Sequence, residues 1–203
     1  MKTPLLSILI ASIPSRMDKA RALYENLLFQ AGKNDHGTVE ILLFLDNKQR
    51  SVGMKRQSLL DLSRGEYIVF VDDDDEVSDL YVTKIVQAIL VDNIARGAEK
   101  PDVIVWPILV SINGAQKGIV LPSIAHINKP IPEYEPPVTY RPPHHLCCWK
   151  REIAIKGVFP DKQHGEDFDW ARQVWPHAKT EKFVELALYH YRWDKAVTEA
   201  EPV

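Results

Sequence analysis

The chain contains very little cysteine. Of its 203 residues only Cys147 and Cys148 are cysteines, and they are neighbours in the sequence. Adjacent cysteines are poorly placed to form a disulfide with each other, and two thiols are too few for a cysteine-based zinc cluster. The sequence therefore shows no disulfide framework. This fits a reducing compartment, and we expect a cytoplasmic protein.

Long hydrophobic runs and an excess of positive charge are also missing. The apolar run at residues 5–11 is interrupted by Ser7 and is far shorter than the roughly 20 residues that span a bilayer. The residues that follow it, Ile-Pro-Ser-Arg, do not resemble a signal-peptide cleavage site. The formal net charge of -3 argues against general binding to nucleic acids or anionic membranes. We therefore expect no transmembrane segment and no general nucleic-acid binding.

Strand and helix patterns alternate along the first half of the chain. With 45% hydrophobic residues the chain can form one full core, and we expect a single domain over residues 1–203. Strands are expected at 5–11, 39–45, 67–71 and 102–110, and helices at 15–32, 53–63 and 79–90. A capping box at Ser15–Asp18 is expected to start the first helix. This order predicts an α/β fold of the Rossmann-like type, with a mostly parallel central sheet and helices on both faces.

The pattern changes after residue 114. Residues 130–143 contain six of the 14 prolines, so we expect a long loop over the surface rather than a helix or a central strand. A short helix is expected at 151–156, a longer one at 166–175, and a strand of alternating polarity at 183–192.

Four consecutive aspartates, Asp72 to Asp75, end the apolar run YIVFV. Adjacent carboxylates repel one another, so a bound cation is the usual reason for such a cluster. Since a buried parallel strand delivers its last residues to the ligand-binding edge of the sheet, we expect these acids in a crevice. The alternative is a solvated loop that caps the next helix. Strand alternation predicts that Asp72 and Asp74 face the ligand, whereas Asp73 and Asp75 face solvent or cap the next helix.

Two cations, Lys55 and Arg56, open the helix expected at residues 53–63. Cations oppose the dipole at a helix N-terminus, and a bound phosphate would offset that cost. Two surface charges tolerated on an exposed turn explain the pattern equally well. Asp46 ends the second strand and is expected at the same edge of the sheet, whereas Asp102 opens its strand and is excluded. Together these residues suggest a nucleotide diphosphate and a hard metal ion such as magnesium or manganese.

Several segments resemble family 2 glycosyltransferases of the GT-A fold. The segment GMKRQ at 53–57 is similar to that family's G-x-x-x-R-N motif. RGEYI at 64–68 is similar to its A-R-G-E-Y-I motif, and VDDDD at 71–75 to its L-D-x-D-D motif. Weaker likenesses are IASIPSR at 10–16, KGVFP at 156–160, GEDFD at 165–169 and YHYR at 189–192. The resemblance covers roughly residues 5 to 192.

The resemblance implies an inverting, metal-dependent transferase that uses a nucleotide-sugar donor, and we expect that donor to be a UDP-sugar. Residues 1–110 would form the nucleotide-sugar-binding half and residues 111–203 the acceptor-binding half. The implied nucleotide-binding residues are Ser12, Pro14, Arg16, Asp46, Lys55, Arg56, Asp72 and Asp73. Asp74 would be the principal ligand of a manganese or magnesium ion, and His190 a further ligand, although a core histidine explains His190 as well.

Asp167, next to Glu166, would be the general base that deprotonates the acceptor hydroxyl. A positioned base contributes roughly 10² to 10⁴ in rate. The alternative is that Glu166 and Asp167 only stabilise the start of their helix through its dipole. The acceptor is not identified by the sequence, and a saccharide, a lipid-linked glycan, a protein and a modified nucleobase all stay open. His144 and His145 could line the acceptor side or lie on the surface, and Trp149 and Trp170 could stack on a sugar or belong to the core.

Two other functions compete with this one. Asp73 and Asp75 fit the nucleophile and acid–base positions of haloacid dehalogenase-type phosphatases, although that motif normally follows the first strand. The third possibility is a non-catalytic module that binds a nucleotide sugar without turnover.

Overall fold

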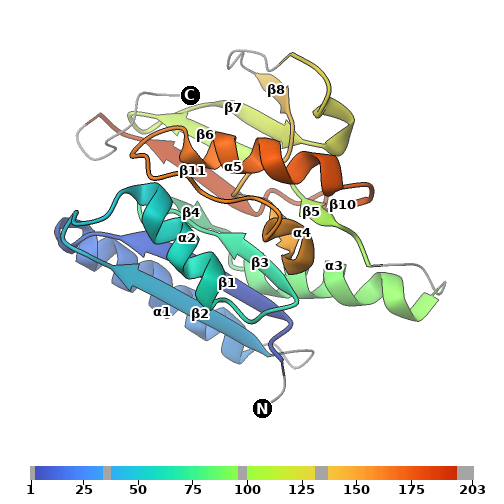
Figure 1. Cartoon of the computed structure of the whole chain (residues 1–203), viewed down its shortest axis with the longest axis horizontal. Helices are drawn as coiled ribbons and strands as arrows, with labels where there is room; N and C mark the ends of the chain where they lie inside the picture. Colours follow the sequence, from blue (N-terminus) through green and yellow to red (C-terminus); the bar gives the residue numbers. More distant parts are fainter. Residues whose placement is uncertain (1–2, 34–37, 96–99, 131–136, 196–203) are drawn as a thin grey trace.

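The computed structural model describes residues 3–33, 38–95, 100–130 and 137–195, which form two mixed β-sheets with helices around them (Figure 1). The six-stranded sheet has the order β10-β5-β9-β3-β1-β2. Its strands are β1 (Leu6–Ser12), β2 (Val39–Leu45), β3 (Tyr67–Phe70), β5 (Val103–Val105), β9 (Cys148–Lys150) and β10 (Glu181–Phe183). The five-stranded sheet has the order β4-β11-β6-β7-β8. Its strands are β4 (Glu76–Val77), β6 (Ile108–Ile112), β7 (Ala115–Pro122), β8 (Val138–Arg141) and β11 (Tyr189–Trp193).

Five α-helices and three 3₁₀-helices are found in the described part of the chain. The α-helices are α1 (Met17–Gly32), α2 (Val52–Leu62), α3 (Tyr81–Ala95), α4 (Arg151–Ala154) and α5 (Glu166–Val174). The 3₁₀-helices are η1 (Pro14–Arg16), η2 (Ile124–His126) and η3 (Trp175–His177). Among these residues, none of the helices combines the length and the hydropathy that a membrane crossing requires.

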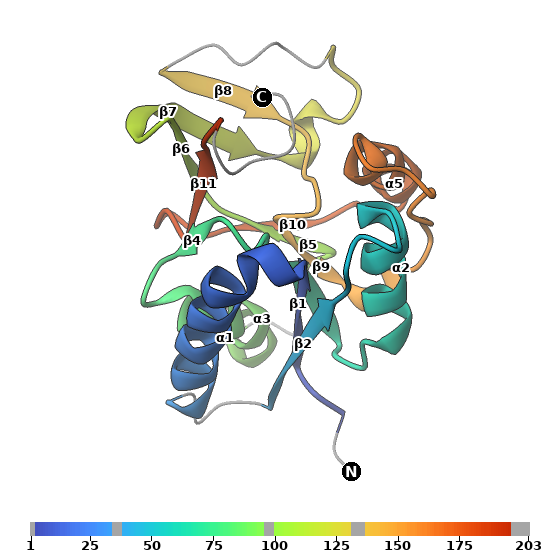
Figure 2. The same ribbon diagram turned by 90° about the vertical axis from the view of Figure 1, so that its left-hand side faces the viewer.

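The predicted parallel arrangement of the first three strands is confirmed, as is the presence of helices on both faces. β1 pairs in parallel with β2 and with β3. Alternate residues of β1 face opposite ways: Leu6 and Ile8 pack in one core cluster with α1 and α3, whereas Leu9 packs in the other with α2 and α5. Figure 2 shows α1 and α3 on one side of this sheet and α2 on the other.

The prediction of a mostly parallel sheet is not confirmed as it stands: β10 also pairs in parallel with β5, but both sheets are mixed. β9 runs antiparallel to both β3 and β5, and in the second sheet β6 pairs antiparallel with β7 and β4 with β11. The chain reaches β9 directly from β8 and not through a crossover helix, so a parallel direction is not imposed on it. β9 is only three residues long, which is too short to produce a recognisable strand pattern.

Two predicted strands are each divided between the two sheets. The run at 102–110 forms β5 and β6, which are separated by Trp106 and Pro107, and proline lacks the N–H that a continuous ladder needs. The predicted strand at 183–192 overlaps β10 and β11, and the residues between them form neither. Leu186, an apolar residue in the middle of that predicted strand, is exposed and lies in the connection between β10 and β11.

Two smaller predictions also need correction. The capping box at Ser15–Asp18 is not formed, because Arg16 is the N-cap of α1 and makes no side-chain capping bond; the preceding η1 starts with a proline instead. Of the proline-rich segment, residues 131–136 lie outside the described residues. Its end is not a surface loop, because residues 138–141 form the edge strand β8 and Pro142 and Pro143 are buried.

Gly53, at the start of α2, lies against the loop that leads to α5. Its N–H donates to the Lys162 carbonyl oxygen at 3.1 Å, and Ser51 Oγ, in the N-cap of α2, donates to Asp161 Oδ1 at 2.7 Å. A Cβ atom on Gly53 would clash with the carbonyl oxygen of Pro160. The absence of a side chain at residue 53 therefore allows the two segments to approach each other.

We expect Gly53→Ala to lower the free energy of unfolding by about 1–3 kcal/mol, because a backbone atom must move to accommodate the methyl group. Urea denaturation measures this change. Gly32→Ala is the matched control, since no atom lies within 4 Å of its added Cβ. A Gly53→Ala variant as stable as the Gly32→Ala variant would contradict the close approach.

Candidate functional site

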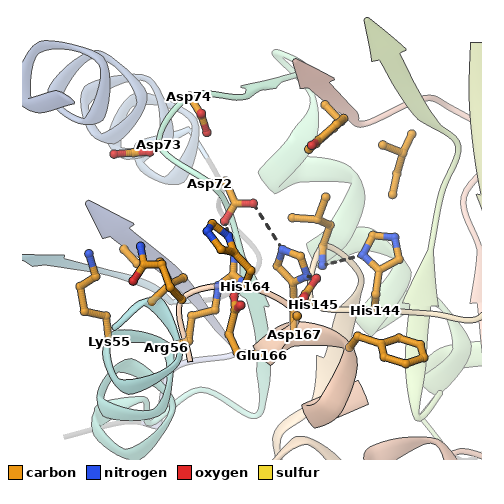
Figure 3. A pocket seen from close by; sticks show the side chains of 18 of the residues that line it. Lys55, Arg56, Asp72, Asp73, Asp74, His144, His145, His164, Glu166 and Asp167 are labelled. Atoms are coloured by element: carbon orange, nitrogen blue, oxygen red, sulfur yellow. Dashed lines mark hydrogen bonds and ion pairs between the residues drawn. The ribbon is translucent and has the colours of Figure 1, made fainter. Parts of the chain in front are cut away.

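A cavity of about 510 Å³ lies where the carboxyl ends of β1 and β3 meet the starts of α2 and α5 and the second sheet (Figure 3). Most of the predicted site residues line it: Ser12, Arg16, Lys55, Arg56, Asp72, Asp73, Asp74, Glu166 and Asp167. Pro14, Asp46 and His190 are not among its lining residues. The fold therefore brings together acids that are far apart in the sequence.

The four aspartates do not alternate as predicted. β3 ends at Phe70, and the chain then turns so that the Asp75 N–H donates to the Asp72 carbonyl oxygen at 3.2 Å. Strand alternation therefore does not extend to the acids, and the expectation that Asp73 and Asp75 face solvent is wrong. Asp73 is buried and accepts from Ser12 Oγ at 2.6 Å and from Arg16 Nη1 at 2.8 Å.

Asp75 is also buried and is bound by β11. It accepts from the Tyr189 hydroxyl at 2.7 Å and from the Arg192 N–H at 2.7 Å. Burial, and next the charge of Asp72, raise the pKa of Asp75 well above its usual range. Asp75 is thus a structural acid that connects the aspartate turn to the second sheet.

Asp72 uses its two carboxylate oxygens for two different cations. Arg56 Nη2 donates to Oδ1 at 2.6 Å, and His145 Nε2 lies 3.3 Å from Oδ2. Burial alone would raise the pKa of Asp72, but Arg56 and His145 outweigh it and lower that pKa well below the ordinary value. Asp72 is therefore ionised at neutral pH.

Lys55 and Arg56 are buried, which excludes the alternative of two surface charges on an exposed turn. Lys55 Nζ lies 3.5 Å from Asp46 Oδ1 and donates to the Ser12 carbonyl oxygen at 3.4 Å. Arg56 Nη1 donates to Glu166, so this guanidinium joins Asp72 to the first residue of α5. The first turn of α2 thus presents both cations to the carboxyl edge of the sheet.

Glu166 and Asp167 open α5, after Gly165 in the left-handed conformation with φ of 74°. Asp167 Oδ2 lies 2.9 Å from His145 Nδ1, and its side chain is 31% exposed, whereas that of Glu166 is 5% exposed. Burial opposes ionisation of Asp167, but His145 and then Arg56 outweigh it and lower its pKa. Burial raises the pKa of Glu166 despite Arg56. Asp167 is therefore the ionised and accessible member of the pair.

The pKa of Asp74, like that of Asp75, is raised, whereas that of Asp72 is lowered. Burial, followed by the charges of Asp72 and Asp73, raises the pKa of Asp74 to about 6 against the opposing effect of Arg16, whose Nη1 lies 3.2 Å from Asp74 Oδ2. In the described residues no group of three or more His, Cys, Asp or Glu side chains is arranged to bind a metal ion. Carboxylate oxygens at Asp74 suit a hard divalent cation that completes its shell with substrate phosphates and water. The residues fit a metal shared with the substrate and not an all-protein cage.

His190 is not brought to the aspartates. Its Nε2 lies 3.0 Å from Ser111 Oγ and its Nδ1 3.4 Å from Glu76 Oε2. Its neighbour Tyr189 points the other way, to Asp75, and Tyr191 lines the cavity. Strand alternation in β11 explains this difference.

Sequence reasoning did not identify the role of His145. Both His144 and His145 line the cavity, and the option of a surface position is wrong for His145: it is buried and contacts two predicted site residues. No sequence pattern around His145 predicts these contacts, because they are made with residues that follow β3 and begin α5. Arg141, His144, His164 and Tyr191 also line the cavity. Trp149 and Trp170 are fully buried core residues, so their alternative role in sugar stacking is excluded.

Solved structures of Staphylococcus aureus TarS share this fold. Residues 1–349 of TarS in complex with UDP-GlcNAc match 97% of this chain and 59% of that chain, with a TM-score of 0.63 and 13% identity. The complex of the same TarS fragment with UDP matches 92% of this chain and 60% of that chain, with a TM-score of 0.62 and 13% identity. This chain thus spans about 60% of the length of those TarS structures. No protein-family model and no curated protein sequence matches it.

The contact between His145 and Asp167 predicts a pH-dependent stability. Burial favours neutral His145, but Asp167 and Asp72 outweigh it and raise its pKa from 6.5 to about 9. Because the pKa is raised in the folded state, the stabilisation is fully present below the pKa of the unfolded state. It is lost as the pH rises through the folded-state pKa of about 9. We expect the stability difference between the wild type and His145→Gln to be largest near pH 6 and to shrink up to pH 9.5. Urea denaturation across this range measures it, and a pH-independent difference would contradict the charged contact.

Proposed function

We propose that this protein is a glycosyltransferase of the family 2, GT-A type, which transfers a sugar with inversion from a nucleotide-diphosphate donor, a UDP-sugar, to an acceptor hydroxyl. One observation carries the proposal: the acids that follow β3 and the Glu166–Asp167 pair line the same cavity. The likeness to TarS structures that contain UDP-GlcNAc and UDP supports a nucleotide-sugar donor.

The donor would bind at the carboxyl ends of β1, β2 and β3, the usual ligand position in open α/β sheets. Asp46 at the end of β2 accepts the Arg50 N–H through Oδ2 at 3.0 Å, and its Oδ1 is directed toward Lys55. Lys55 and Arg56 supply positive charge for the diphosphate. Ser12 and Asp73 bind each other and orient Arg16 at the edge of the cavity, so their contribution to donor binding is through Arg16.

A manganese or magnesium ion at Asp74, if bound there together with the donor, would neutralise charge on the diphosphate as it leaves. Burial and the acidic neighbours of Asp74 raise its pKa and so oppose its ionisation. A bound cation would offset the repulsion and favour the ionised carboxylate. The proposed metal site rests on Asp74 and does not include His190, whose imidazole contacts Ser111 and Glu76.

Asp167 would act as the general base. The acceptor oxygen attacks the anomeric carbon, the bond from that carbon to the diphosphate oxygen breaks, and the hydroxyl proton moves to Asp167. The accessible carboxylate of Asp167 is open to the cavity, and its lowered pKa keeps it ionised. Glu166 pairs with Arg56 and would orient α5 without accepting a proton.

The acceptor would occupy the part of the cavity that the second sheet lines. Ile108 and Val110 of β6 and Val120 of β7 form an apolar wall there, and Arg141 of β8 and Tyr191 of β11 add polar groups. A saccharide, a lipid-linked glycan, a protein and a modified nucleobase are all acceptors that this proposal admits.

The contacts of Asp73 and Asp75 disfavour the phosphatase alternative. A nucleophile must reach phosphorus, yet both oxygens of Asp73 are bound by Ser12 and Arg16, and both oxygens of Asp75 are bound by Tyr189 and Arg192. The alternative of a non-catalytic binding module is tested by turnover.

We expect Asp167→Asn to lower kcat by about 10²–10⁴-fold, because the amide cannot accept the acceptor's proton. Donor affinity should change little. A coupled assay of UDP release from a panel of UDP-sugars with manganese measures turnover, and calorimetry measures donor affinity. Asp169→Asn is the matched control, since Asp169 is partly exposed and pairs with Lys162 outside the cavity lining. Full activity of Asp167→Asn would exclude it as the base.

Metal dependence can be tested without turnover. We expect UDP with manganese to raise the Tm of the wild type, and we expect that shift to disappear in a chelator and in Asp74→Asn, because the ion would bridge Asp74 and the diphosphate. An equal shift in the chelator would refute the metal site at Asp74.

A further inference from the structure

Two buried cations connect the nucleotide side of the cavity to its catalytic side. Asp72 lies at their centre, with Oδ1 bound to Arg56 and Oδ2 next to His145. Arg56 continues to Glu166, and His145 continues to Asp167 (Figure 3). Each of the first two residues of α5 is therefore joined to Asp72 through one cation.

The ring of His145 is oriented by its backbone as well as by these acids. The Phe70 N–H donates to the His145 carbonyl oxygen at 3.3 Å, which fastens this residue directly to the end of β3. On the preceding residues, Trp149 Nε1 donates to the His144 carbonyl oxygen at 2.9 Å and Trp175 Nε1 to the Pro143 carbonyl oxygen at 2.6 Å. Because β9 and η3 both donate hydrogen bonds to this loop, the position of His145 is restricted.

His145 is poorly placed to be the base itself. Its Nδ1 lies 2.9 Å from Asp167 Oδ2 and its Nε2 lies 3.3 Å from Asp72 Oδ2, so each ring nitrogen faces a carboxylate. The Nδ1 contact is an ion pair that does not meet hydrogen-bond geometry. Two carboxylates beside the ring favour the imidazolium form, which offers no lone pair to an incoming hydroxyl. The proton acceptor must be an oxygen of Asp167.

We propose that His145 is a positioning residue that aligns the Asp167 carboxylate through Nδ1 and ties it to Asp72 through Nε2. This inference rests on the proposed function. By occupying Oδ2, the imidazole leaves Oδ1 of Asp167 for the acceptor hydroxyl and restricts rotation of the carboxylate. Because the other ring nitrogen contacts Asp72, the position of the base depends on the acid at the nucleotide side of the cavity.

Two amide replacements separate the two contacts. The side-chain nitrogen of asparagine can occupy the position of Nδ1, and that of glutamine the position of Nε2. His145→Asn therefore keeps a donor for Asp167, and His145→Gln keeps a donor for Asp72. We expect His145→Gln to lower kcat about 10²-fold, the effect of a misplaced catalytic group, and to change the KM for the donor little. His145→Asn should retain kcat within about tenfold and raise the donor KM more.

Two controls exclude a loss of folding and a general effect of replacing a histidine. His177→Gln replaces an exposed histidine of η3 outside the cavity and should leave both constants unchanged. Each variant is compared by Tm, so that a loss of kcat in a folded protein is attributed to the site. Equal losses of kcat in His145→Asn and His145→Gln, or a larger loss in His145→Asn, would overturn the positioning role of Nδ1.

A measurement on the protein without any donor keeps the inference apart from the proposed function. In ¹⁵N-histidine-labelled protein, Asp167→Asn should shift the Nδ1 resonance of His145, and Asp72→Asn should shift its Nε2 resonance. An unchanged Nδ1 resonance in Asp167→Asn would overturn the bridge. Absence of turnover with every nucleotide sugar, with these shifts present, would refute the proposed function while the bridge itself stands.

Discussion

The site depends on one half-buried carboxylate, that of Asp72, which is shared by two buried cations. Asp72 follows a strand that is buried along its whole length, and three more aspartates follow it. Such a cluster is unfavourable unless its charge is compensated, because burial and mutual repulsion both favour the protonated forms. Arg56 and His145 compensate Asp72, Arg16 compensates Asp73, and hydrogen bonds from β11 support Asp75. Removing one partner of such a buried pair would leave the other uncompensated, which typically costs about 3–5 kcal/mol.

The same contacts explain why segments far apart in the chain meet. Arg56 comes from the first turn of α2, His145 from the connection between β8 and β9, and Glu166 and Asp167 from the start of α5. α2 and α5 approach closely because Gly53 has no side chain, and Gly165 adopts the left-handed conformation that directs the chain into α5. The arrangement is thus a set of converging segment ends, each with one or two charged groups, around the end of β3.

Local patterns were sufficient for the elements whose residues interact with near neighbours. The apolar runs of β1, β2 and β3 and the helices between them were predicted close to their observed bounds. Burial on both faces explains the continuous apolar runs of β1 and β3. The patterns failed where long-range pairing decides the structure. β9 is three residues long, and the break at Trp106–Pro107 sends β5 and β6 to different sheets, so neither the mixed sheets nor the divided strands follow from periodicity. The alternation expected for Asp72 to Asp75 failed because the strand ends at Phe70.

By itself, the sequence determined which charged groups stand at the ends of the regular elements around the cavity. The acids after the third strand, the two cations that open α2 and the acid pair that opens α5 are all local features, each visible as a charge at the end of a regular element. Only the tertiary structure decided their roles relative to one another. It buried Lys55 and Arg56, turned Asp73 and Asp75 inward, directed His190 to Ser111 and Glu76, and placed His145 between Asp72 and Asp167. The reason is physical: the ionisation and orientation of a buried charge depend on its neighbours in space, and here those neighbours lie as many as 117 residues away in the chain.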